Sequence, residues 1–169
     1  TATPNDLMRC IIMNNEPSVT IRNIESAFAG ESMAHIKYLY FARLCRAQGD
    51  EQTARVFEET AAQEVQHAFG HLDLLYPKTA MDVSRCLDMA IAGETYEYTE
   101  MYPSFRHAAV QEGNTAAVRE IDEQIEESKE HAANFRATLE KAAKRFAALA
   151  KVEERHAQHY RDTLARVQS

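Results

Sequence analysis

The residues of this chain best suited to chemistry are glutamates and histidines that recur at short, regular spacings. Two segments place a glutamate three residues before a histidine, and a third places two glutamates three residues apart. Residues three apart share one face of a helix, so each pair can direct both side chains at a single ion. With one further glutamate, the candidate metal ligands are Glu31, Glu64, His67, Glu94, Glu97, Glu153 and His156.

This inventory is typical of a carboxylate-bridged di-iron centre inside a bundle of four helices. Carboxylates can bridge two cations, and imidazoles beside open coordination positions suit non-haem iron. The same ligands also accommodate manganese or a mixed metal pair. Solvated surface charge is the alternative interpretation for any one pair. Buried carboxylates are costly unless they pair or bind metal, so four such groups on four helices favour a metal site.

The composition predicts an all-α protein that can position these ligands. Of the 169 residues, 45% are hydrophobic, and only 5 are glycine and 4 proline. Few helix breakers and no alternating strand pattern indicate helices throughout. We expect a leader over residues 1–19 and then a single ferritin-like domain over residues 20–169. Its helices should cover about 20–48, 51–76, a stretch from about 82 that is kinked at Pro103, and most of 114–167.

A repeat within the chain supports two related helix pairs. The segment AFAGES at 27–32 matches AIAGET at 90–95, and each precedes an aromatic-rich helix that ends near a glycine. Such a repeat indicates a pseudo-two-fold arrangement of the two pairs.

Charge and cysteine content bear on partners and compartment. A net charge of −7 disfavours a general nucleic-acid or anionic-membrane binder, and no apolar run is long enough to span a membrane. Three cysteines without a Cys-x-x-Cys pair suit a reducing compartment, and we expect a cytoplasmic protein.

Four segments of the sequence closely resemble rubrerythrins: AFAGESMAHIKYLYFA, EETAAQEVQHA, AGETYEYTEMYPSF and AKVEERHAQHY. The resemblance covers most of residues 20–165. It implies a di-iron peroxidase that reduces hydrogen peroxide to water, with the seven ligands above. It also implies that Tyr38 and Tyr102 hydrogen-bond to ligand carboxylates. The alternative interpretation is core aromatic packing, and both roles can hold together.

Rubrerythrins proper carry a rubredoxin domain with four cysteines, which this sequence lacks. The chain therefore resembles the shorter members of the family and should take electrons from another protein such as rubredoxin. Two other functions remain open: a ferroxidase or iron-handling protein with dioxygen as oxidant, and a non-enzymatic helical bundle.

The last helical region is about 25 residues longer than the repeat requires, and the segment 131–139 resembles 156–164. In one register the chain turns at Gly113, so that Ser128 and His131 lie level with Glu97. Glu127 or Glu130 would then serve with His131, or Glu153 would reach another subunit.

We favour the other register. In it the third helix runs through Gly113 and the chain turns near residues 125–128, which returns Glu153 to the level of Glu97. This register predicts an extended hairpin of helices three and four. Ile121 and Ile125 on that hairpin should contribute to a homodimer contact.

Overall fold

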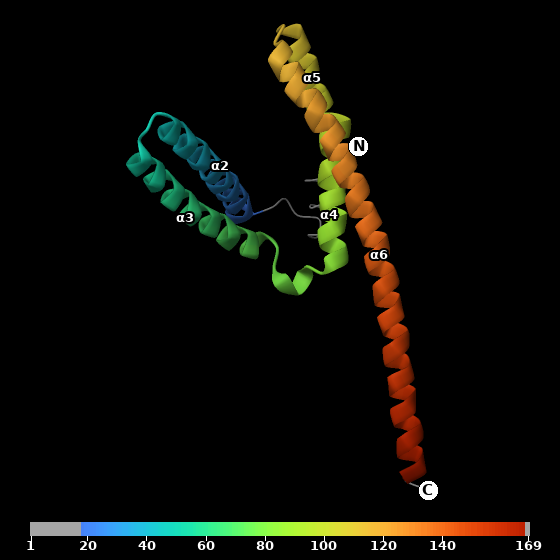
Figure 1. The fold of residues 1–169 in the computed structure, drawn as a ribbon. Coiled ribbons are helices and arrows are strands. Elements are labelled where there is room, and N and C mark those ends of the chain that lie inside the picture. Colours follow the sequence, from blue (N-terminus) through green and yellow to red (C-terminus); the bar gives the residue numbers. More distant parts are fainter. Residues whose placement is uncertain (1–17, 168–169) are drawn as a thin grey trace. The chain divides into compact units, whose positions relative to one another are not determined.

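The computed structural model of this chain describes residues 18–167, and every regular element in that range is helical. The elements are α2 (Val19–Ala47), α3 (Glu51–Leu75), the short 3-10 turn η1 (Lys78–Ala80), α4 (Val83–Tyr96), the π-helix η2 (Glu97–Met101), α5 (Tyr102–Gln111) and α6 (Thr115–Val167) (Figure 1). The all-α prediction is therefore confirmed. None of the described helices is both long and apolar enough to cross a membrane.

The described residues form two compact units, 18–81 and 82–167. The first contains the helix pair α2–α3, and the second contains α4, η2, α5 and α6. The predicted leader lies outside the described residues except for Ser18, which caps α2, and Val19, its first residue. The prediction of one domain over 20–169 stays a prediction.

Side-chain caps and one glycine define the ends of α2 and α3. Ser18 caps α2 by accepting a hydrogen bond from the Ile21 amide at 3.2 Å. After α2, Gly49 takes a φ of 83°, which a residue with a side chain rarely adopts. Asp50 then caps α3 by accepting from the Thr53 amide at 2.9 Å. The predicted break between the first two helices therefore lies where the sequence indicated.

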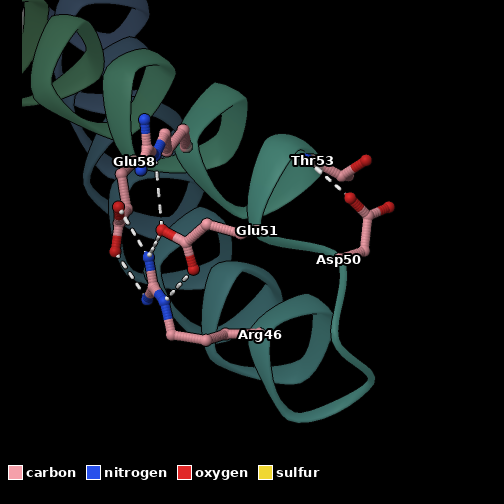
Figure 2. A network of polar contacts seen from close by, with 6 residues as sticks. Arg46, Asp50, Glu51, Thr53 and Glu58 are labelled. Atoms are coloured by element: carbon pink, nitrogen blue, oxygen red, sulfur yellow. Dashed lines mark hydrogen bonds and ion pairs between the residues drawn. The ribbon is translucent and has the colours of Figure 1, made fainter.

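A network of charged side chains holds the two helices together beside this turn (Figure 2). The Arg46 guanidinium on α2 donates to the carboxylates of Glu51 and Glu58 on α3, with shortest distances of 2.9 Å to each. These hydrogen bonds lower the pKa of both carboxyls and raise the pKa of Arg46 above its usual range. The network links the end of one helix to the first two turns of the next.

Alanines line the contact between α2 and α3. Ala54, Ala61 and Ala68 are buried at intervals of seven residues along α3, and Ala42 is buried on α2. Small residues at a heptad interval let two helices approach closely along a narrow seam. His35 on α2 crosses this seam and donates from Nδ1 to the Ala61 carbonyl at 2.7 Å.

In the second unit, a π-helix separates α4 from α5. The Tyr102 amide bonds to the Glu97 carbonyl five residues back, which widens the turn. Pro103 follows within the first turn of α5. Its missing N–H and bulky ring would disturb an α-helical bond to residue 99, and the wider turn accommodates the proline. Where we expected a kink at Pro103, the structure has the π-helical segment Glu97–Met101 just before it.

The predicted turn near residues 125–128 is wrong. The chain reverses at Gly113, which has a φ of 69°, and Asn114 caps the next helix by accepting from the Ala117 amide at 3.1 Å. From Thr115 to Val167, α6 is one uninterrupted helix of 53 residues. The hairpin exists, but its tip lies 12 or more residues earlier in the chain than we expected, because glycine and asparagine end one helix and begin the next.

The first half of α6 packs antiparallel against α5, η2 and α4. Arg106 forms an ion pair with Asp122, and Arg136 donates to the Thr95 hydroxyl at 2.9 Å. Ala142 is the last buried residue of α6. The following 25 residues, 143–167, extend beyond the start of α4 (Figure 1), and we call them the overhang.

Candidate metal centre

Three of the predicted ligands converge in the α2–α3 unit. Glu31 on α2 and Glu64 and His67 on α3 place one ligand atom each within 4.8 Å of one another. His67 Nδ1 lies 3.0 Å from a Glu64 oxygen and 3.9 Å from a Glu31 oxygen. Glu64 is only 16% exposed, whereas the imidazole of His67 is 58% exposed. Two partly buried carboxylates beside one imidazole form a donor set that suits a divalent metal ion.

The alanine seam explains this convergence. Ala61 and Ala68 lie three residues before and four residues after Glu64, so they share its face of α3. Because both alanines are buried against α2, the carboxylate of Glu64 is carried toward that helix. Glu31 lies one turn from His35, the residue that bonds across the seam. Close packing of small residues thus brings the acidic side chains together.

A second cluster forms in the other unit, where α4 and η2 face α6. Ser128 is 3% exposed, and its hydroxyl donates to a Glu97 carboxylate oxygen at 3.1 Å. His131 Nδ1 lies 3.4 Å from Glu94 Oε2. That glutamate oxygen is buried and has no hydrogen-bond partner within the described part of the chain.

The buried oxygen of Glu94 is the observation that tests whether a metal fits here. A carboxylate oxygen without a hydrogen bond is costly to bury, and a cation beside it removes that cost. The neighbouring imidazole of His131 supplies the nitrogen ligand that iron commonly takes. The donor chemistry of this cluster therefore fits a carboxylate-bound metal.

The two predicted tyrosines lie in different surroundings. Tyr102 is half-buried, and burial raises its pKa, with a further contribution from the charges of Glu97 and Glu94. It therefore keeps its phenolic proton at neutral pH. Tyr38 packs against Phe57, with ring centroids 5.9 Å apart, which agrees with its interpretation as a core aromatic residue.

The structure does not bring Glu153 and His156 to the carboxylates of α4 and η2. Both lie in the overhang, 25 residues after Ser128 and His131, which is about 37 Å along a continuous helix. Their side chains are 77% and 61% exposed. His131 takes the place that we had expected His156 to occupy.

His131 was absent from the predicted ligand set because the favoured register moved it away from Glu94. The signal that identifies it is the pair Gly113 and Asn114, a helix stop followed by a helix cap. A turn there brings residue 128 level with residue 97, as in the register that we did not favour.

The rubrerythrin family model matches residues 22–139 of this chain. That match includes Ser128 and His131 and ends before Glu153 and His156. Among curated relatives, nigerythrin of Nitratidesulfovibrio vulgaris is 40% identical over 111 residues, which are 59% of this chain and 55% of the relative. Rubrerythrin of the same organism is 41% identical over 107 residues, or 57% of this chain and 56% of the relative.

Rubrerythrin of Porphyromonas gingivalis is 34% identical over 162 residues, which cover 89% of this chain and 68% of that protein. The chain spans a little over half the length of the nigerythrin and the rubrerythrin of Nitratidesulfovibrio vulgaris. Among solved structures, fully reduced, all-ferrous nigerythrin is 33% identical and covers 78% of this chain and 72% of its own, with a TM-score of 0.38.

Proposed function

Because this chain belongs to the rubrerythrin family, a family of di-iron oxidoreductases, we propose that it reduces hydrogen peroxide to water with electrons from a separate donor. The observation that carries this proposal is the convergence of Glu31, Glu64 and His67 inside the segment that the family model matches. Two carboxylate oxygens and one imidazole nitrogen within 4.8 Å of one another can supply three ligands to a metal ion.

We propose that both ligand clusters bind iron. The α2–α3 cluster offers three ligands, and the cluster on α4, η2 and α6 offers Glu94, Glu97 and His131. Ser128 supports Glu97 by donating a hydrogen bond to it. His131 replaces His156 in the set expected from sequence, and Glu153 has no support as a ligand in this unit.

Reduction of one peroxide molecule to two waters consumes two electrons and two protons. A bound pair of ferrous ions would supply these two electrons, and the external donor would replace them. The chain's own residues hold the metal and control protons. Tyr102, which keeps its phenolic proton beside Glu94 and Glu97, is the proposed hydrogen-bond donor to these carboxylates. Tyr38 is proposed for the same role on α2.

The electron donor is proposed to be rubredoxin or a similar iron protein, as membership of the rubrerythrin family suggests. Cys45 and Cys86 are free thiols, which supports the proposed cytoplasmic location. A homodimer is the assembly that we propose.

Anaerobic stopped-flow mixing tests the function. The di-ferrous protein should be oxidised faster by peroxide than by dioxygen. Glu64→Gln should abolish that oxidation together with iron binding, whereas Glu59→Gln, an exposed carboxylate on the same helix, should leave both unchanged. Faster oxidation by dioxygen would instead assign a ferroxidase or oxidase activity.

Iron analysis tests the revised ligand set. Loss of a metal-bound imidazole weakens binding, by at least the ten- to hundred-fold typical of lost supporting partners. We therefore expect His131→Ala to lower iron affinity by about that factor or more, and His156→Ala to leave it unchanged. The reverse pattern would restore the register that places Glu153 and His156 in the di-iron centre.

A further inference from the structure

The two candidate metal clusters correspond residue by residue within the internal repeat. Glu31 and Glu94 take the same place in its two matching segments. In the first unit, His67 Nδ1 lies 3.9 Å from a Glu31 oxygen. In the second unit, His131 Nδ1 lies 3.4 Å from Glu94 Oε2. The two imidazoles are also exposed to a similar extent, 58% and 54%, so the repeat extends from the sequence to the geometry of each cluster.

Ser128 takes the position of Glu64 in this correspondence. Each of these two residues lies 15 residues after the turn glycine of its unit and three residues before the histidine of its cluster. Each is followed four residues later by a buried alanine, Ala68 or Ala132, so both side chains face the neighbouring helix. The second unit therefore has a serine at a position where the first unit has a candidate ligand carboxylate.

The second unit has an additional glutamate at another position. Glu97 lies three residues after Glu94 and shares its helical face, whereas the residue three positions after Glu31 is Ala34. Each cluster thus has two glutamates and one histidine. In the first cluster the second glutamate comes from the facing helix, and in the second cluster it comes from η2, which continues the helix of Glu94.

The two positions that differ between the clusters are in contact in the second unit. Ser128 is 3% exposed, and its hydroxyl donates to a Glu97 carboxylate oxygen at 3.1 Å. A hydrogen bond to one carboxylate oxygen orients the glutamate and leaves its other oxygen available to a cation. Serine is also uncharged, so it adds no third negative charge beside Glu94 and Glu97.

We propose that Ser128 is a positioning residue that makes Glu97 the second carboxylate ligand of this cluster, in place of a ligand at position 128 itself. This inference rests on the proposed function, because it takes the cluster of Glu94, Glu97 and His131 to be an iron site. The residue at position 128 then decides which helix supplies the carboxylate. A glutamate introduced at that position should therefore make Glu97 dispensable.

Equilibrium dialysis of the full chain against Co²⁺ tests the role of the hydroxyl. The parent should bind one ion at each cluster. Ser128→Ala should bind one of the two ions about ten- to hundred-fold more weakly, which is the usual effect of losing a hydrogen bond to a metal ligand. The visible absorption of the bound Co²⁺ should change as well, because it depends on the number and geometry of the ligands.

Thr138→Ala is the matched control for this measurement. It removes a hydroxyl of the same helix that donates to the Asn134 carbonyl, and it should bind both ions like the parent. Binding by Ser128→Ala that equals binding by the parent would overturn the proposal. Ser128→Ala adds no charge to the helix contact, so it decides the role of the hydroxyl even where Ser128→Glu does not fold.

A second comparison tests the exchange of ligands between positions 97 and 128. In the parent, Glu97→Gln should weaken binding of the same ion by about ten-fold or more. The Ser128→Glu chain should bind this ion at least as tightly as the parent, and adding Glu97→Gln to it should have little effect. The difference between these two effects measures the coupling of the two positions. Equal effects of Glu97→Gln in both chains would overturn the proposal.

Glu94→Gln separates this inference from the proposed function. It removes a ligand that does not depend on Ser128, and it should weaken binding of the same ion. If Glu94→Gln loses this ion and Ser128→Ala does not, the metal site stands and only the role of Ser128 is refuted. If neither variant affects Co²⁺ binding, the metal assignment of this cluster fails as well. Slow oxidation of the ferrous protein by peroxide would refute the proposed function and leave the Co²⁺ results unchanged.

Discussion

The buried oxygen of Glu94 predicts that one substitution will have opposite effects with and without metal. Glu94→Gln keeps the shape of the side chain and removes its charge. In the metal-free protein, the present carboxylate buries Oε2 without a hydrogen bond, beside His131 at 3.4 Å. We therefore expect the glutamine variant to be more stable than the parent when no metal is bound.

The magnitude follows from the cost of leaving a buried polar group unsatisfied, about 1 to 3 kcal/mol, with more for a charged group. A neutral amide in the same place recovers part of this, about 1 kcal/mol. For a chain of this length that raises the unfolding midpoint by roughly 2 to 4 °C. When metal is bound, the parent should be more stable than Glu94→Gln. Ferrous iron at a hundred times its dissociation constant stabilises the parent by about 2.7 kcal/mol, and a variant without this ligand gains far less.

Thermal unfolding under anaerobic conditions, with chelator and then with ferrous iron, measures both effects. Glu123→Gln changes an exposed carboxylate on α6 and should follow the parent in both states. If Glu94→Gln destabilises the metal-free protein, its carboxylate already has a favourable partner. The unpaired Glu94 oxygen would then no longer be evidence for a bound cation, and the proposed metal site of Glu94, Glu97 and His131 would lose its main support.

Two further predictions concern the helix ends. Arg46→Met should lower the unfolding midpoint at neutral pH. The difference from the parent should begin to shrink near the ordinary glutamate pKa of about 4.3 and vanish below the lowered folded-state pKa values of Glu51 and Glu58, because protonation of these carboxylates removes their bonds to Arg46. A difference that does not depend on pH would contradict this origin. Gly113→Ala should destabilise the protein by about 1 to 2 kcal/mol, because Gly113 has a φ of 69° that alanine rarely adopts. Gly30→Ala should instead stabilise it by about 0.5 to 1 kcal/mol, because Gly30 lies within α2 and has open space where a Cβ would be. Chemical denaturation measures both changes.

Local signals in the sequence predicted most of the fold. Gly49 and Asp50 mark the end of α2 and the start of α3, Pro77 follows the end of α3, and Asp82 caps α4. Each of these residues acts on the backbone beside it, so its effect does not depend on distant packing. The family match confirms the predicted ferritin-like, all-helical fold class.

The position of the last turn could not be obtained from helical periodicity. Residues 128 and 153 are 25 positions apart, which is close to seven whole helical turns, so both lie on the same face of α6. The apolar pattern is therefore satisfied by either register. The complete Glu-x-x-His at Glu153 favoured the wrong one, although the stop at Gly113 and the cap at Asn114 marked the turn.

The same limit applies to the candidate site. Spacing predicted the pair Glu64 and His67, the ligand inventory of a four-helix di-iron bundle added Glu31, and the structure brings these three together. The contact of Ser128 with Glu97 required knowledge of which segment of α6 packs there. A serine in that place carries no signal of its own in the sequence.

The π-helix η2 has a consequence for the length of its helix. Its wide turn holds one residue more than an α-helical turn would, so residues after it are shifted by one position relative to those before it. Deleting a single residue such as Thr99 would remove that extra residue and restore an α-helical turn, so the following helix would keep its orientation, with Arg106 beside Asp122 and Ala109 buried. A further inserted residue, which no wide turn absorbs, would rotate the following helix by about 100° and separate Arg106 from Asp122. Between Glu97 and Pro103, loss of one residue should therefore be tolerated better than gain of one.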